Sequence, residues 1–529
     1  MRMPHWLWLF VIAALIWSWS LHLLGWLVTP KGYRYFWILP LYPADCNFHL
    51  SWARQAYDGK NRFADLFTTE EHAPLTFNLH DWLIGKLSRW VSISLHISMK
   101  LLHTIGVIFF IIAAWWLSVP ILTESQQRTY LLMLCFLGGF ISLGMPEANT
   151  YIALTTFSWF VWGKALLAVL IGSIIRMSME ENNGKMILIG SLSGILLGNI
   201  HPYALAPICY ALPLWLFLNW AINKRMRSEI LLSLIPVSSA IFSAALQAFA
   251  ILGDPVYQVV FRNPPSLAPP IWYFILNYGL IFFLAVLASI QLLRKLRMQA
   301  AESLLIFWFV GSFLAVYLTP TALERRLIEG AHLPMCILAS LSWHKIILKR
   351  AAFLHRIQLL VLMLLGGIAP LNFWAFQAEE LITNSRPDLH LHKGLPLFLS
   401  EQHLQLLEWL ESNTMPDEVI LCSYELGNYI PALTGRKVFI GHWSLTINLD
   451  EKFKIARKIW RGELPINEAR ELFRKHRIRY ALATIYERHA TKTKHLPEYC
   501  PYLPEHFHIG KYGEVVFRIG DDAIYKLQW

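Results

Sequence analysis

The chain is poor in charged residues: Asp, Glu, Lys and Arg make up only 15% of its 529 residues, whereas soluble domains carry about a quarter. Hydrophobic residues reach 56%, and the mean hydropathy is +0.42. This balance excludes an ordinary cytosolic enzyme and a disordered, collagen-like or coiled-coil chain. The net charge of +11 does not require a nucleic-acid partner, because positive loops beside membrane helices explain it better; we expect no nucleic acid among the partners.

Metal-binding and phosphate-binding motifs are missing as well. The 6 cysteines include no Cys-x-x-Cys pair and no Cys/His cluster, so we expect no structural metal site and no redox dithiol. Cys422 and Cys500 share the polar C-terminal part, where two interpretations are open: a disulfide outside the cytoplasm, or two free buried thiols. No Gly-rich phosphate loop occurs there, which argues against nucleotide hydrolysis.

Long apolar runs follow one another as far as residue 377. A helix needs about 20 apolar residues to span a bilayer. Eleven candidate spans lie at residues 6–28, 101–122, 130–146, 158–177, 186–203, 204–222, 230–252, 271–293, 302–320, 331–347 and 357–377. The first run lacks a small-residue cleavage site, so we expect an anchor rather than a removed signal peptide. Residues 1–377 are thus predicted to be a polytopic α-helical membrane domain.

Basic residues gather in alternate loops, which is typical of the cytoplasmic side. They include Arg128, Arg176, Lys185, Arg294 and Lys345. The N-terminus is therefore predicted to be cytoplasmic. The long first loop (29–94), which follows the first span, is then extracytoplasmic. An odd number of spans places residues 378–529 on the same outer side, where we expect the functional face.

Three outer segments carry patterns of their own. Residues 47–59 show helical spacing of apolar positions and predict an amphipathic helix along the membrane surface, whereas 63–74 reads as loop. Residues 253–270 are rich in proline and predict an ordered irregular loop. After residue 400, helical patterns alternate with strand patterns. The helices are predicted at 403–413, 452–462 and 466–476, and the strands at 418–424, 437–441, 479–485 and 514–520. Residues 378–529 are therefore predicted to form an α/β domain.

Asp45 is the first candidate for chemistry, since it follows the first span on the outer side. A partly desolvated carboxylate serves as a general base or as a hard-oxygen metal ligand, but Asp also favours helix N-caps. His49 lies four residues on, on the same helical face; it either shares this site or is a solvated interface histidine. Glu147, in the next outer loop, is either a second carboxylate of the site or an ordinary loop residue.

Further candidates lie at the outer ends of later spans. His201 interrupts an apolar run, where an ionisable group is either functional or a helix-end cap. Arg325 and Arg326 suit a lipid phosphate, because guanidinium groups bind phosphate oxygens bidentately; the alternative is internal pairing with nearby glutamates, Arg325 with Glu329 at i+4. His332 belongs to the same charged stretch. His442 follows a predicted strand end, a place suited either to acceptor binding or to packing.

The resemblance to a known family is carried by four stretches: YPADCNFHLSWARQAYDG, GNIHPY, ERRLIEGAHLP and YELGNYIPALTGRKVFIGHW. They resemble multi-span bacterial proteins of the GT-C superfamily, which includes dolichyl-phosphate-mannose and undecaprenyl-phosphate-sugar transferases. The resemblance matches Asp45 and Glu147 to the acidic residues of the first two outer loops. Many members have two acidic residues in a row where this chain has Asp45 and then Cys46, which favours a reaction without a metal, although a divalent ion stays open.

The resemblance implies an inverting glycosyltransferase of the bacterial inner membrane. It would move a sugar from a polyprenyl-phosphate donor to a hydroxyl group of a lipid, glycan or protein. A carboxylate would take the acceptor proton while positive groups hold the leaving phosphate. Two other classes stay open: a lipid or polysaccharide transporter, which would show internal repeats that this chain lacks, and a membrane scaffold with a binding domain, which would tolerate loss of Asp45.

Overall fold

The computed structural model describes residues 3–179, 183–223, 228–262, 265–295, 298–347, 352–386, 395–488 and 507–529. The chain divides into two compact units. The helical unit comprises Met1–Leu21, Lys100–Phe249 and Pro265–Phe376, and the sheet unit comprises His22–Met99, Ala250–Pro264 and Gln377–Trp529. Residues 22–99 thus group with the C-terminal residues, although more than 270 residues separate them in sequence.

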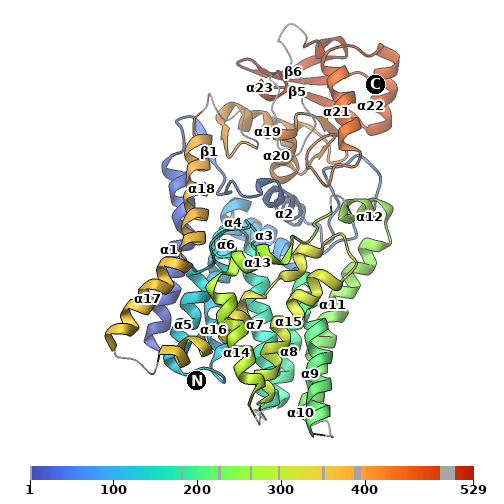
Figure 1. The fold of residues 1–529 in the computed structure, drawn as a ribbon. Helices are drawn as coiled ribbons and strands as arrows, with labels where there is room; N and C mark the ends of the chain where they lie inside the picture. Colours follow the sequence, from blue (N-terminus) through green and yellow to red (C-terminus); the bar gives the residue numbers. More distant parts are fainter. Residues whose placement is uncertain are drawn as a thin grey trace. The chain divides into compact units, whose positions relative to one another are not determined.

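The helical unit consists of helices. Four boundaries between the two units fall within α1, α4, α11 and α18, so each of these four helices has residues in both units. The elements of the helical unit are α1 (His5–Leu27), α4 (Leu95–Ser118), α5 (Glu124–Phe136), α6 (Thr150–Ala153), α7 (Ser158–Ser178), α8 (Asn183–Ile200), η1 (Pro202–Leu205), α9 (Ala206–Asn223), α10 (Ser228–Leu232), α11 (Leu234–Leu252), α13 (Ile271–Tyr278), α14 (Leu280–Leu293), α15 (Ala300–Leu318), η2 (Glu324–Ile328), α16 (His332–Ile347), α17 (Ala352–Gly366) and α18 (Ile368–Asn384). The pairs α7 and α8, α9 and α15, and α14 and α16 pack side by side (Figure 1).

Within the described ranges, six helices are long and apolar enough to cross a membrane, or up to eight if two bent helix pairs each count as one span. A polytopic helical membrane protein is therefore confirmed, whereas the number eleven is not. The run at 130–146 is not one helix: α5 ends at Phe136, and an ideal Cβ on Gly139 would lie only 2.0 Å from the Leu276 carbonyl oxygen. The run at 271–293 bends by 100° at Gly279, where φ is +51°.

The sheet unit contains a five-stranded mixed sheet in the order β4-β3-β5-β7-β6. Its elements before residue 377 are β1 (Tyr33–Tyr35), α2 (Pro43–Tyr57), α3 (Leu79–Val91) and α12 (Pro255–Arg262). Its elements after residue 377 are β2 (Phe398–Ser400), α19 (Glu401–Asn413), β3 (Val419–Leu421), α20 (Tyr424–Thr434), β4 (Lys437–Val438), α21 (Leu449–Trp460), α22 (Ile466–His476), β5 (Ile478–Ala483), α23 (Ile485–Arg488), η5 (Ile509–Lys511), β6 (Gly513–Ile519) and β7 (Asp522–Leu527). β3 runs parallel to β4 and β5, while β7 is antiparallel to β5 and β6. β1 pairs with β2 antiparallel.

The elements predicted after residue 400 are all present, and β7 is an additional strand. The expectation of an irregular segment at 253–270 is wrong in part, because α12 occupies Pro255–Arg262. Proline is tolerated at the first helical position, and the Asp254 carboxylate accepts a hydrogen bond from the Val256 backbone N–H at 2.8 Å. Cys422 is buried and has no disulfide partner among the described residues, while Cys500 lies outside them, so the two interpretations of this pair stay open.

The long first loop contributes α2 and α3, which pack closely on each other. An ideal Cβ on Gly85 would lie 2.2 Å from the Ala53 carbonyl oxygen, so only glycine permits this approach. Trp52, Ala56 and Phe63 form a small core beneath α2. The helix predicted at 47–59 is thus present but begins earlier, at Pro43, which brings Asp45 into it.

Candidate functional site

Asp45 lies in the first turn of α2. The N-cap is Tyr42, in the left-handed region at φ +54°, so the interpretation of Asp45 as a helix N-cap is wrong. A carboxylate in the first turn faces the positive end of the helix dipole, which stabilises its charge. Its side chain is 32% exposed, and Oδ1 lies 3.5 Å from Nε2 of His442. Asp45 therefore combines access to solvent with a neighbouring imidazole.

His442 is held in place by the segment after β4. Gly427 of α20 permits the approach, because an ideal Cβ there would lie 2.0 Å from the Ile440 carbonyl oxygen. The backbone N–H of Ser444 donates to Nδ1 of His442 at 3.2 Å, so the neutral ring carries its proton on Nε2, the atom nearest Asp45. The rings of Phe67 and Phe48 lie 5.5 and 6.2 Å from the imidazole. We call Asp45, His442, Phe48 and Phe67 the Asp45 cluster.

His49 bonds to a different carboxylate. Nδ1 of His49 and Nδ1 of His80 lie 2.8 and 2.9 Å from the two oxygens of Asp81, whose side chain is buried. Burial raises the pKa of the Asp81 carboxyl, but the two imidazoles outweigh it and the pKa is lowered. The alternative of a solvated His49 is wrong, because its side chain is only 14% exposed. The structure places His49 on Asp81, and its role in substrate binding stays a prediction.

The surroundings of Asp45 do not suit a metal ion. Burial, followed by the charge of Asp45, raises the pKa of the Cys46 thiol, so Cys46 stays protonated and is a poor ligand. Over the described residues, no group of three or more His, Cys, Asp or Glu side chains has the geometry to hold a metal. The residues present do not fit a metal centre at Asp45.

The helical unit holds a second set of charged side chains, which is fully buried. Nζ of Lys164, on α7, lies 2.6 Å from Oε1 of Glu329 and donates to the Glu147 carbonyl oxygen at 2.9 Å. Nε2 of His201 lies 3.4 Å from Oε2 of Glu329, without the geometry of a hydrogen bond. We call Lys164, Glu329, His201 and Glu147 the Glu329 cluster. It joins a loop, a helix and two helix ends into one ion-paired core.

Gly163 makes room for His201, since an ideal Cβ there would lie 3.0 Å from the His201 Cβ. The ring of Tyr203 lies 5.7 Å from the His201 ring, and the Arg326 guanidinium lies over Tyr203 at 5.6 Å. The motifs that contain His201 and Arg326 are therefore brought together in space. The carboxylate of Glu147 is buried, and its Oε2 has no hydrogen-bond partner among the described residues.

The pairing expected between Arg325 and Glu329 is wrong, because Glu329 pairs with Lys164 and His201. Nε of Arg325 is buried and has no hydrogen-bond partner within the described ranges. His332 begins α16 and is buried; its Nδ1 lies 3.1 Å from Thr150 Oγ1, and its ring stacks on Tyr278 at 5.5 Å. The structure thus places His332 in the packed core of the helical unit.

Sequence reasoning missed Lys164 and Asp81. A signal for Lys164 was available, because it is a cation well inside the apolar run at 158–177, whereas Arg176 stands at the end of that run. Ionisable groups inside such runs are costly unless paired. Asp81 gives no such signal, since a carboxylate in the first turn of a surface helix is ordinary.

Comparison with known proteins identifies the fold. No family model and no curated protein matches the sequence. The structure of ArnT from Cupriavidus metallidurans bound to undecaprenyl phosphate is similar, with a TM-score of 0.57, 10% identity and coverage of 99% of this chain and 98% of that chain. The chain has the GT-C fold.

A second GT-C fold structure is that of the Archaeoglobus fulgidus oligosaccharyltransferase AglB with an inhibitory peptide and a dolichol-phosphate. Its TM-score is 0.54 at 12% identity, over 90% of this chain and 69% of that chain. Another structure of the Archaeoglobus fulgidus oligosaccharyltransferase, a complex with Zn and sulfate, has a TM-score of 0.53 at 12% identity, over 89% of this chain and 67% of that chain. The resemblance drawn from the sequence motifs is therefore confirmed for the fold.

Proposed function

We infer that this protein is a membrane glycosyltransferase that transfers a sugar from a polyprenyl-phosphate donor to an acceptor hydroxyl group with inversion. The fold supports this inference: it matches nearly the whole of ArnT, whose structure holds undecaprenyl phosphate, and most of AglB, whose structure holds a dolichol-phosphate and a peptide. The acceptor is a lipid, glycan or protein.

The observation that carries the chemistry is the partly exposed carboxylate of Asp45 beside an oriented imidazole. In the proposed reaction, Asp45 accepts the proton of the acceptor hydroxyl as its oxygen attacks the anomeric carbon. The bond between that carbon and the phosphate oxygen breaks, and the polyprenyl phosphate leaves with the electron pair. His442, with its Nε2 proton toward Asp45, orients the carboxylate and contacts the acceptor. His49 is assigned to substrate binding and is held by Asp81.

The helical unit supplies the proposed phosphate ligands and a second carboxylate. Arg326 and Arg325 are assigned to the leaving phosphate, because guanidinium groups match phosphate oxygens. Glu147 is assigned as the second catalytic carboxylate, with its loop held by Lys164. His201 and His332 remain assigned to substrate binding. We derive no step through a metal ion, since the residues around Asp45 do not fit one.

The proposal also places the protein in the bacterial inner membrane, with eleven spans and the N-terminus in the cytoplasm. Residues 378–529 are then extracytoplasmic, because basic residues gather in the alternate loops. A reporter that works only in the cytoplasm, fused after Trp529, should be inactive, and one that works only outside should be active. The opposite pattern would reject the orientation.

The function is tested by transfer from undecaprenyl-phosphate sugars to extracts of cell-envelope lipids and glycans by the purified protein. Asp45→Asn should lower turnover by about a hundredfold or more, the usual contribution of a positioned base, with unchanged folding and donor binding. Glu71→Gln is the matched control, because Glu71 is a 91% exposed carboxylate of the same outer loop. Near-normal transfer by folded Asp45→Asn would remove Asp45 from the mechanism, and directional movement of donor lipid without transfer would favour a transporter.

A further inference from the structure

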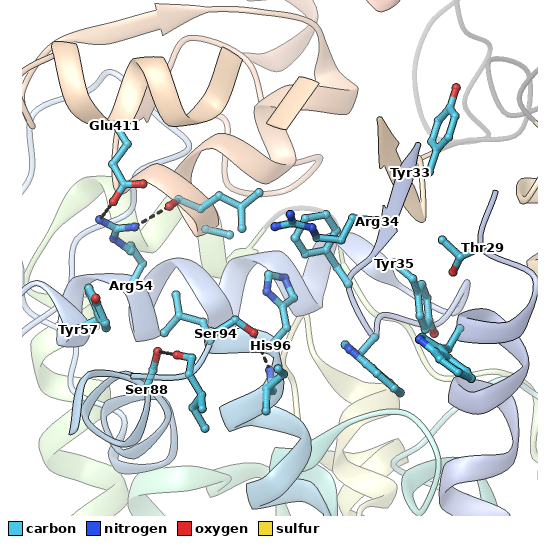
Figure 2. A pocket seen from close by; sticks show the side chains of 18 residues that line it. Thr29, Tyr33, Arg34, Tyr35, Arg54, Tyr57, Ser88, Ser94, His96 and Glu411 are labelled. Carbon is cyan, nitrogen blue, oxygen red and sulfur yellow. Dashed lines mark hydrogen bonds and ion pairs between the residues drawn. The ribbon is translucent and has the colours of Figure 1, made fainter. Parts of the chain in front are cut away.

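The sheet unit has a cavity of about 660 Å³, and no residue of the Asp45 cluster lines it. Sites for small ligands usually measure about 300 to 1,000 Å³, so a head group fits here. The cavity is lined by the end of α1, the segment around β1, the C-terminal half of α2, the start of α4, and residues of α19 and α20. Figure 2 shows Arg34, Arg54, His96 and Glu411 around it.

The cavity lies where two candidate membrane spans end. Trp26, in the last turn of α1, and Ile97, in the first turn of α4, both line it and are 59% and 43% exposed. Both helices are long and apolar enough to span a membrane. Trp is enriched at membrane–water interfaces, so a ligand of this cavity has its polar part at the level of the lipid head groups.

The charges that line the cavity differ in how they are neutralised. Arg54 donates to Asp58 at 3.1 Å and to Glu411 at 2.6 Å, and also to the Leu433 carbonyl oxygen at 2.6 Å. Arg34 is exposed on β1, and its guanidinium has no ion pair or hydrogen bond within the described ranges. Arg34 is therefore a cation available to an anionic ligand, while the charge of Glu411 is held by Arg54.

A buried polar group lines the same cavity. His96 is only 3% exposed, its ring lies 4.7 Å from the ring of Phe36, and its Nε2 has no hydrogen-bond partner within the described ranges. A buried polar atom without a partner is costly, so a ligand that bonds to His96 would recover that cost. Trp37 and Phe36 supply apolar wall beside these two polar groups.

We propose that this cavity binds the phosphate-bearing head group of an anionic membrane phospholipid, which is neither donor nor acceptor in the reaction. Arg34 pairs with the phosphate, His96 hydrogen-bonds to the head group, and the exposed apolar side chains of Trp26 and Ile97 contact the start of the acyl chains. Basic pockets beside membrane helices recognise lipid head groups in this way.

The test uses the full-length protein reconstituted in nanodiscs that contain equal amounts of phosphatidylglycerol and phosphatidylcholine, without sugar donor. Native mass spectrometry counts the lipids that stay bound. The wild type should retain phosphatidylglycerol about tenfold over phosphatidylcholine, and Arg34→Gln should abolish this preference, since a charge-assisted hydrogen bond accounts for about a tenfold change in affinity. Arg62→Gln should leave the preference unchanged, because Arg62 is an exposed arginine of the same loop that does not line the cavity.

Three results would overturn the proposal. The first is equal retention of both lipids by the wild type, and the second is an equal loss of preference in Arg34→Gln and Arg62→Gln. The third is glycerol phosphate in detergent binding as tightly as phosphatidylglycerol, which would make the ligand a free phosphate compound. His96→Leu, which keeps Arg34, should weaken retention of phosphatidylglycerol severalfold. Because no donor is present, these outcomes do not depend on whether the protein transfers a sugar.

Discussion

The Asp45 cluster and the Glu329 cluster place a carboxylate beside a histidine in two different ways. Asp45 is 32% exposed, and Nε2 of His442 lies 3.5 Å from its Oδ1. Glu329 is fully buried, with Lys164 at 2.6 Å and His201 at 3.4 Å. A carboxylate neutralised at short range inside the protein holds elements together, whereas an exposed one near an imidazole can take a proton from a substrate. Glu329 is therefore suited to a structural role, and Asp45 to the role of a general base.

The largest effect is expected when the buried pair is broken. Lys164→Met removes one partner and leaves the charge of Glu329 buried, which should destabilise the protein by about 3–5 kcal/mol. Thermal unfolding in detergent, followed by intrinsic fluorescence, measures the loss. Lys164 also bonds to the Glu147 carbonyl oxygen, so the loop that contains Glu147 should become more accessible to proteases.

The double variant Lys164→Met with Glu329→Gln is the control for this change. It removes both charges, so it should be more stable than Lys164→Met alone. If the double variant is no more stable than the single one, the 2.6 Å ion pair between Lys164 and Glu329 is not the source of the effect. The structural role of the buried Glu329 carboxylate would then be rejected.

A second test of this contrast uses Asp65, a buried carboxylate that forms no ion pair among the described residues. Burial raises its pKa to about 7, against the hydrogen bond from the Phe67 N–H and the positive charges of Lys452 and Lys437. Between the ordinary aspartate pKa and about 7, the folded protein holds a proton that the unfolded chain has released. Stability therefore falls as pH rises through this window.

Asp65→Asn removes this titration. The variant should be more stable than the wild type at pH 8, by a few kcal/mol at most. It should differ little at pH 3, which lies below the ordinary aspartate pKa of 3.8, so that the wild-type carboxyl is mostly protonated in both states. Unfolding midpoints at the two pH values measure the difference. Glu71→Gln, an exposed carboxylate of the same loop, should show no such gain. A gain for Asp65→Asn that is equal at both pH values would mean that the charge is not responsible.

The sequence indicated Asp45, Glu147, His201, Arg326 and His442 from local patterns, because each stands beside a span end, a proline or a strand end. It could not indicate that Glu329 binds Lys164 rather than Arg325, since that contact joins positions 165 residues apart. Helical periodicity gave the C-terminal helices, whose apolar faces pack on the sheet. The hydropathy pattern wrongly predicted one helix at 130–146, because it carries no information on the close approach of the Leu276 carbonyl oxygen to Gly139.

A smaller effect is expected at His442. Its ring packs between Phe48 and Phe67 and lies beside Asp45, so His442→Ala should raise the acceptor KM by about tenfold and leave donor affinity unchanged. His442→Phe preserves the ring volume and should keep the fold while losing the acceptor contact. If donor and acceptor affinities fall together in both variants, His442 is a brace between α2 and the C-terminal segment rather than an acceptor ligand.

The smallest effect is expected from removal of metal ions. A metal at the Asp45 cluster would need a second hard ligand, but the next residue is Cys46, whose thiol stays protonated because burial raises its pKa, and His442 keeps its Nδ1 bonded to Ser444. Dialysis against EDTA should therefore change turnover by less than about twofold, with Zn²⁺ or Mn²⁺ added back as the comparison. A loss of about a hundredfold that either ion restores would show that Asp45 works as a metal ligand, and the contrast with Glu329 would then lie between a metal-bound and an ion-paired carboxylate.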